Sequence, residues 1–131
     1  MNPSKPTLLL VEDDSLIADL LKKKFVLEGY TLFRAGTADE AHQLLNEHHR
    51  IDLILLDLLL PGRDGFSFLQ EIKNDPRRSS IPVIIISNLG QEADISRGLA
   101  LGAESYLIKA NFTPKEVLEE VESVLKSKKQ R

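Results

Sequence analysis

The sequence contains no cysteine among its 131 residues, which excludes a disulfide framework and any metal site built from thiolates. It has no apolar run approaching the roughly 20 residues that a membrane-spanning helix needs, and its first residues lack the apolar core of a signal peptide. A basic excess is also missing, because 17 Lys and Arg face 20 Asp and Glu, and this argues against direct nucleic-acid binding. These absences favour a cytoplasmic domain with no membrane span.

The most apolar stretch of the sequence ends in an acidic residue. Leu53–Leu56 is a short, continuous aliphatic run, which is typical of a strand buried on both faces. Asp57 follows it, and Pro61-Gly62 then forces a turn. A carboxylate in such a place costs free energy unless a cation meets it. We therefore expect Asp57 to have a cationic partner elsewhere in the chain.

Strand-like and helix-like patterns alternate five times along the chain. The strands are expected at Thr7–Val11, Tyr30–Arg34, Leu53–Leu56, Ile81–Ile86 and Ser105–Ile108, with helices beginning near residues 15, 37, 65, 91 and 113. Parallel strands need such helical crossovers. The pattern predicts an α/β fold, a flavodoxin-like doubly wound five-stranded parallel sheet of order 2-1-3-4-5 with five helices on both faces. We expect one domain over residues 1–131, with a core at about 7–125 and a frayed basic tail at 126–131.

The first helix has an apolar stripe at helical spacing. Leu16 and Leu20 recur four residues apart, and the line continues to the region of Phe25. Ile17 and Leu21 widen the stripe. We therefore expect this set of side chains to face the core.

In the predicted strand order, residues from four strands meet at the carboxyl edge of the sheet. The first strand brings Glu12 and Asp13, the third Asp57, the fourth Ser87 and the fifth Lys109. Clustered carboxylates repel one another unless a cation binds, and oxygen ligands suit Mg²⁺ better than a transition metal. A nucleophilic Asp57, a metal ion, and Lys109 and Ser87 for phosphoryl oxygens form a layout for phosphoryl transfer.

Four motifs in the expected order carry a family resemblance. They are Val11-Glu12-Asp13-Asp14, Asp57-x-x-Leu60-Pro61-Gly62-x-Asp64-Gly65, Ile84-Ile85-Ile86-Ser87 and Gly102-Ala103-x-x-Tyr106-Leu107-Ile108-Lys109. Together they resemble the receiver domain of two-component response regulators, including the single-domain chemotaxis type. The resemblance implies a phosphorylation-activated signalling switch that accepts a phosphoryl group on Asp57 from a sensor histidine kinase or a phosphotransfer protein. It implies a phosphoacceptor that assists its own phosphorylation and slow dephosphorylation, rather than an enzyme.

The resemblance also implies roles for the other site residues. Mg²⁺, with Mn²⁺ as an alternative, is expected on Glu12, Asp13, Asp57 and the backbone carbonyl of Leu59. Ser87 and Lys109 are expected to bind the phosphoryl group while Tyr106 turns inward. This movement would remodel the face made by the fourth helix, fifth strand and fifth helix, which controls a downstream protein or an attached output and can form a homodimer.

The chain departs from the family pattern near the site. Lys109 is followed by Ala110 where receivers usually have proline, and a cis bond before a non-proline residue costs about 3–4 kcal/mol. We therefore predict a trans Lys109–Ala110 bond and a locally different loop. Asn88 stands where the family has a small residue, which narrows access to the site. Leu59 and Leu89 cannot orient an attacking water, so we expect slow loss of the phosphoryl group.

Two other functions are alternatives to the switch. One is an interaction module that keeps the fold but responds to something other than phosphorylation. The other is a hydrolase similar to the haloacid dehalogenases. Those enzymes carry an Asp-x-Asp motif at this strand end, and here Leu59 stands in place of the second acid. Whether the chain is a stand-alone receiver or part of a longer regulator stays open, as do its kinase and its target.

Overall fold

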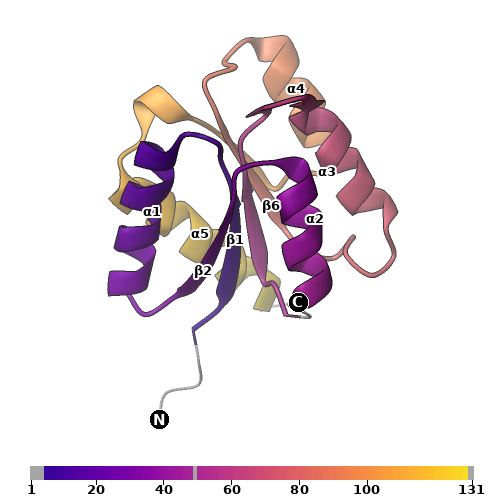
Figure 1. Cartoon of the computed structure of the whole chain (residues 1–131). Helices are drawn as coiled ribbons and strands as arrows, with labels where there is room; N and C mark the ends of the chain where they lie inside the picture. The colour runs from indigo at the N-terminus through magenta and orange to yellow at the C-terminus, as the bar shows by residue number, and fades with distance from the viewer. Residues whose placement is uncertain (1–4, 49, 130–131) are drawn as a thin grey trace.

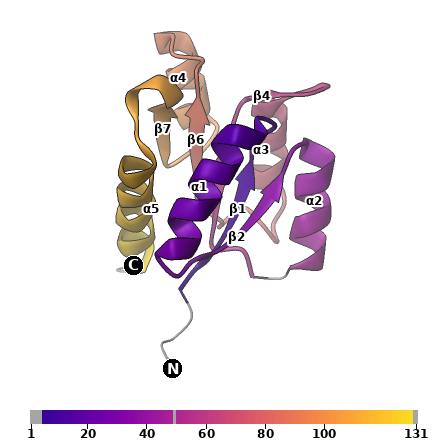
Figure 2. The same cartoon turned by 60° about the vertical axis from the view of Figure 1, so that its left-hand side comes forward.

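The computed structural model describes residues 5–48 and 50–129, and its centre is a five-stranded parallel sheet. The strand order β2-β1-β3-β6-β7 confirms the predicted 2-1-3-4-5 topology. The strands are β1 Thr7–Val11, β2 Thr31–Ala35, β3 Leu53–Leu56, β6 Val83–Ser87 and β7 Ser105–Ile108. In Figure 2 the arrowheads of β1 and β6 point toward the same end of the molecule, where the β4 label also lies. The residues after each strand therefore gather at one edge.

Five helices sandwich the sheet, as predicted. They are α1 Ser15–Leu27, α2 Ala38–Glu47, α3 Gly65–Asn74, α4 Glu92–Ala100 and α5 Pro114–Lys129. Figure 1 shows α1 and α5 on one side of the sheet and α2 and α3 on the other. The core accordingly has two halves, one on each face of the sheet, and β3 between them is buried along its whole length. None of the helices in the described ranges is both long and apolar enough to cross a bilayer.

The apolar stripe predicted for α1 is confirmed for Leu21 and Phe25 and is wrong for Leu16 and Leu20. Ala18, Leu21 and Phe25 are its buried residues, whereas Leu16 is 69% exposed and Leu20 53% exposed. The helix carries apolar side chains on two neighbouring faces, and spacing alone does not say which face the sheet covers. A stripe of exposed leucine is therefore left beside the carboxyl edge of the sheet.

Helix α5 extends further than the sequence indicated. It continues to Lys129, so the prediction of a frayed tail from residue 126 was wrong for residues 126–129. Lys128 pairs with Glu104 at 2.9 Å, and Leu125 is partly buried against the core. These contacts hold the last turns of the helix. Residues 130 and 131 lie outside the described residues.

Two short features lie at the edge of the sheet where the site forms. Leu59–Leu60 and Arg63–Asp64 pair as a two-stranded antiparallel hairpin, β4 and β5, around Gly62, whose φ of 68° suits a residue without a Cβ. The sequence predicted only a turn here, because two-residue strands leave no periodic pattern. After β7, a 3₁₀ turn spans Lys109–Asn111. The described residues contain no cis peptide bond, so the predicted trans Lys109–Ala110 bond is confirmed.

Candidate functional site

The centre of the site is the Lys109 amine, which joins two buried carboxylates. Its Nζ lies 2.7 Å from Glu12 Oε1 and 2.8 Å from Asp57 Oδ2. The side chain of Glu12 is 2% exposed and that of Asp57 3% exposed. An ionised carboxylate at such burial needs a charged partner. Lys109 is thus the cationic partner that the burial of Asp57 requires.

One amine does not fully compensate both acids. Burial raises the pKa of Glu12, the hydrogen bonds from Lys109 and the Asp14 amide oppose this, and the negative charge of Asp57 adds to the rise, so the net pKa lies above its ordinary value. Burial lowers the pKa of Lys109, but its hydrogen bonds to Asp57 and Glu12 outweigh this and leave its pKa above the usual value. The amine therefore stays charged, and its single positive charge faces two carboxyl groups.

A third carboxylate completes an acidic cluster. Glu12, Asp13 and Asp57 each offer an oxygen, and these oxygens lie within 4.8 Å of one another. Asp13 is exposed whereas the other two are buried. A set of hard oxygen donors open to water on one side fits a divalent cation such as Mg²⁺ or Mn²⁺, which keeps several waters when bound. The residues present therefore fit the metal that the sequence pattern implies.

Local backbone packing fixes Asp57 at the end of β3. Its amide donates to Val11 O at 2.9 Å, and its Oδ1 accepts from the Leu59 amide at 3.1 Å. A Cβ on Gly65 would lie 2.5 Å from the Leu58 Cα, so only glycine allows α3 to start this close to the chain after Asp57. The loop that carries Asp57 is therefore held on both sides.

Ser87 and Tyr106 form a second polar group beside the acids. Ser87 is fully buried, and its Oγ accepts from the Leu89 amide at 3.2 Å, while the Tyr106 hydroxyl donates to Leu89 O. Burial and the charge of Asp94 raise the pKa of Tyr106, a hydrogen bond with Ser87 lowers it in part, and Asp57 raises it further. The tyrosine hydroxyl thus lies near Ser87 and within the field of Asp57.

Within the part of the chain that the structure describes, the side chains of the remaining predicted site residues, Asn88, Leu89 and Leu59, have no polar contact with the acids. Asn88 is exposed, and Leu89 is partly buried against the core. Leu59 is 53% exposed, and its amide rather than its side chain contacts Asp57. The side chains of these three residues can therefore affect how water reaches Asp57, but they make no hydrogen bond to the acids.

Arg34 contacts the site although the sequence analysis did not single it out. Its Nε donates to Glu12 O at 2.9 Å and its Nη2 to Asp13 O at 3.0 Å. The only signal in the sequence is a long cationic side chain near the end of the edge strand. The parallel register pairs Arg34 with Leu10, two residues before Glu12, so the topology is needed to place the side chain beside the acids.

Comparisons with known proteins agree with this geometry. Residues 8–122 match the family described as "Response regulator receiver domain". The chain is 36% identical over 125 residues to the probable transcriptional regulator ycf27 of Cyanidium caldarium, covering 95% of this chain and 48% of that protein. The chain spans about half the length of the curated relatives it matches.

Two solved structures have the same fold. The receiver domain of the Francisella response regulator 1452 is 31% identical, with a TM-score of 0.85 over 95% of this chain and 99% of that one. The CheY-like receiver domain protein of Methanospirillum hungatei is 26% identical, with a TM-score of 0.88 over 97% and 98%. Fold, acidic cluster and family match coincide, and this chain belongs to the response regulator receiver domain family.

Proposed function

We propose that the chain is a phosphorylation-activated signalling switch whose phosphoacceptor is Asp57. The observation that supports this most directly is a buried carboxylate beside one amine and two further acids, at the open edge of the sheet. A sensor histidine kinase or a phosphotransfer protein donates the phosphoryl group. The P–N bond of its phosphohistidine breaks, a P–O bond to Asp57 forms, and the imidazole takes a proton from solvent. The product is an acyl phosphate.

In this proposal each site residue has one task. Asp13, Asp57 and the backbone carbonyl of Leu59 hold Mg²⁺ or Mn²⁺, with Glu12 acting mainly through bound water. When bound, the ion supplies positive charge that offsets the charge of the phosphoryl group. Lys109 exchanges part of its contact with Asp57 for a phosphoryl oxygen, and Ser87 offers its hydroxyl to another.

The output is proposed to be the face made by α4, β7 and α5. Tyr106 lies on β7, and its hydroxyl donates to Leu89 O in the loop before α4. The Leu89 amide in turn donates to Ser87 Oγ. A change in the hydrogen bonds of Ser87 therefore alters this face through Leu89. The face controls a downstream protein, an attached output domain or a second copy of the chain. Leu59, Leu89 and Asn88 are proposed to set the lifetime of the acyl phosphate. We further propose one cytoplasmic receiver domain over residues 1–131.

Direct phosphorylation tests the proposal without knowledge of the kinase. The purified chain is incubated with acetyl phosphate and Mg²⁺, and its intact mass is measured. We expect one added phosphoryl group, and none when a chelator removes divalent cations, because the excess negative charge at the site opposes an anionic donor. An unmodified chain in the presence of Mg²⁺ would contradict the proposal and favour the interaction module.

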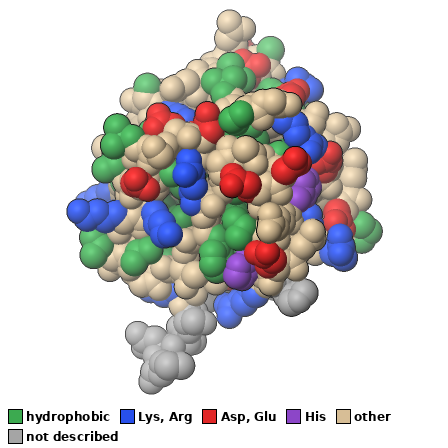
Figure 3. All heavy atoms as spheres, in the orientation of Figure 1, with side chains coloured by type: hydrophobic (Ala, Val, Ile, Leu, Met, Phe, Trp, Pro, Cys, Tyr) green, Lys and Arg blue, Asp and Glu red, His purple; other side chains and the backbone are tan. Residues whose placement is uncertain are grey.

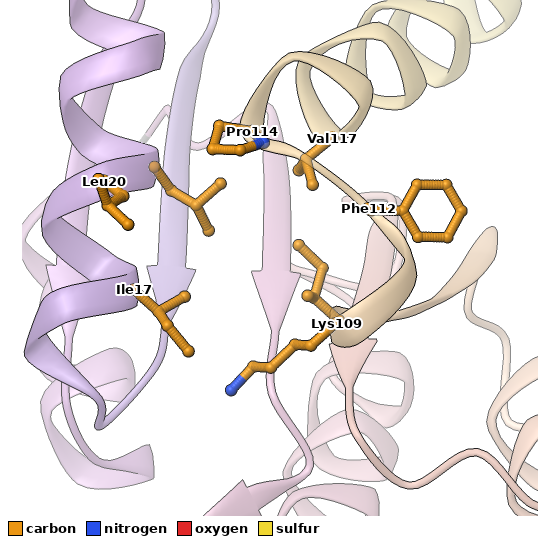
Figure 4. Close-up of a pocket in the computed structure, with 8 residues that line it drawn as sticks. Ile17, Leu20, Lys109, Phe112, Pro114 and Val117 are labelled. Atoms are coloured by element: carbon orange, nitrogen blue, oxygen red, sulfur yellow. The ribbon is translucent and has the colours of Figure 1, made fainter.

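An apolar groove beside Lys109 suggests where a phosphodonor protein docks. The groove, of about 150 Å³, is lined by Ile17, Leu20, Leu21, Ile86, Lys109, Phe112, Pro114 and Val117. Figure 4 shows Ile17 and Leu20 on α1 facing Pro114 and Val117 of α5, with Lys109 along the edge. A donor must bring its histidine to Asp57, so it has to cover surface that adjoins the site. An amphipathic helix that carries the histidine can lie across such a groove and place an apolar side chain in it.

The surroundings of the groove agree with a protein partner. Leu16 and Leu20 are exposed along α1, and Phe112 is exposed at the opposite rim, a pattern typical of interaction surfaces. In Figure 3, acidic and basic side chains are interspersed over the face shown rather than gathered into a basic patch. The exposed side chains of Leu16, Leu20 and Phe112 therefore mark this docking site.

Leu20→Asp is expected to weaken transfer from a protein donor about 10-fold or more, because it places a charge at the centre of an apolar contact. The donor is the autophosphorylated histidine kinase that, among a purified panel, phosphorylates the wild type fastest. Transfer is followed by loss of label from the kinase. The matched control is Leu27→Asp, which changes a leucine that is also exposed (73% against 53% for Leu20) at the far end of the same helix. Equal slowing by both variants, or slowed phosphorylation by acetyl phosphate, would contradict the docking site.

A further inference from the structure

Arg34 holds the turn that carries two of the three acids. The guanidinium reaches from the edge strand β2 and donates to two successive carbonyl oxygens, Nε to Glu12 O at 2.9 Å and Nη2 to Asp13 O at 3.0 Å. A guanidinium presents its donors in a fixed planar fork. One side chain therefore fixes the relative orientation of two consecutive peptide groups between β1 and α1.

The three acids depend on this backbone to different degrees. The carboxylate of Glu12 is held by Lys109 at 2.7 Å and by the Asp14 amide at 3.0 Å, and that of Asp57 by Lys109 and the Leu59 amide. Asp13 differs, since its carboxylate has no hydrogen bond or ion pair to any residue in 5–48 or 50–129. Its place in the cluster is set by its backbone, whose carbonyl Arg34 binds.

We propose that Arg34 is a positioning residue for the cation site, acting through the Glu12–Asp13 turn to keep the Asp13 carboxylate with the other two. The inference rests on the proposed function, because it assumes that the acidic cluster binds Mg²⁺. Removing a group that orients a metal ligand through a hydrogen bond typically lowers the affinity for the metal by about 10–100-fold. Arg34 also carries a positive charge, which alone would weaken cation binding. The two effects have opposite signs, so suitable variants separate them.

Two substitutions distinguish positioning from charge. Arg34→Lys keeps the charge, but an ammonium cannot donate to both carbonyls in the fork geometry. Arg34→Gln removes both the charge and the fork. If positioning dominates, both variants bind Mg²⁺ about 10-fold more weakly than the wild type. If charge dominates, the lysine variant binds like the wild type and the glutamine variant binds more tightly, and either result would overturn the proposal.

The affinity is measured by titrating Mg²⁺ into the full chain and following backbone amide shifts by NMR. A second readout uses metal-free protein, in which hydrogen exchange of the Asp14 amide, which donates to Glu12 Oε2 at 3.0 Å, is expected to be faster in both variants. Arg77→Gln is the matched control, because Arg77 is exposed and pairs with Asp75 far from the acids. Thermal unfolding checks that each variant folds, and Arg34→Lys is the conservative change.

Failure of this inference and failure of the proposed function give different results. A wild type that binds Mg²⁺ while both Arg34 variants bind equally well would overturn the role of Arg34 alone. A wild type that shows no Mg²⁺-dependent shifts would instead remove the proposed function. In that case the hydrogen exchange still decides whether Arg34 fixes the turn, and unchanged exchange in both variants would reject it.

Discussion

Lys109→Met is expected to destabilise the protein by about 3–5 kcal/mol at neutral pH in the absence of divalent cations, the usual effect of removing one partner from a buried ion pair. Methionine keeps much of the aliphatic stem but lacks the amine. Glu12 and Asp57, both almost fully buried, would then repel each other with no opposing charge. The free energy of unfolding is measured by urea denaturation followed by circular dichroism.

The destabilisation should depend on pH, with a definite sign. The pKa of Glu12 is already raised above its model-peptide value of 4.5 by burial, and the Lys109 hydrogen bond is the largest effect that opposes the rise. Without the amine the folded state holds a proton at pH values where the unfolded chain has lost it. The stability of Lys109→Met therefore increases as the pH falls toward 4.5 and decreases as the pH rises above it. Mg²⁺ should restore part of the loss at neutral pH.

Lys73→Met is the matched control for this experiment. Its amine is also partly buried, but it donates to the backbone carbonyls of Ser79 and Ile81 rather than to carboxylates. We expect a smaller loss of stability, about 1–2 kcal/mol, as for hydrogen bonds of a charged group. This loss should change little between about pH 5 and 8, because no carboxylate loses its partner. Equal pH profiles for the two variants would show that Lys109 does not neutralise the buried acids.

The strands and their order could be predicted because the three central strands, β1, β3 and β6, are short apolar runs with a polar residue at or just after their ends. β3 and β7 have the predicted bounds, and Ser87 and Lys109 lie where the ends of β6 and β7 were expected. In a parallel sheet these ends share one edge, so the order of strands alone brings the site residues together. The sequence therefore predicted that Asp57 and Lys109 are neighbours, but it did not predict the distances between their atoms.

The features that the sequence did not reveal depend on tertiary contacts. The buried side of α1 is chosen by the sheet, which takes Ala18, Leu21 and Phe25 rather than Leu16 and Leu20. Arg34 resembles any polar residue on an edge strand until the register places it beside the Glu12–Asp13 turn. Neither feature leaves a periodic or local pattern, and both bear on function, one through docking and the other through the cation site.

Asp57→Asn is expected to abolish uptake of a phosphoryl group from acetyl phosphate, measured as intact mass. The amide nitrogen of asparagine is not a nucleophile, and its single carbonyl oxygen carries no charge. The fold should survive, because Lys109 keeps its contact with Glu12 at 2.7 Å and the repulsion between the acids decreases. We expect the free energy of unfolding to change by about 1 kcal/mol or less, because one buried acid and one ion-pair contact are lost together.

The matched control for Asp57→Asn is Asp64→Asn, which changes an acid in the same loop. Asp64 caps α3 by accepting from the Phe66 amide at 2.9 Å, and asparagine caps a helix about as well. This variant should take up phosphate like the wild type. If the Asp57→Asn protein still gains a phosphoryl group, peptide mapping will place it on another residue, and Asp57 cannot then be the acceptor. If both variants lose uptake, disruption of the loop rather than loss of a nucleophile explains the effect, and the assignment of Asp57 fails as well.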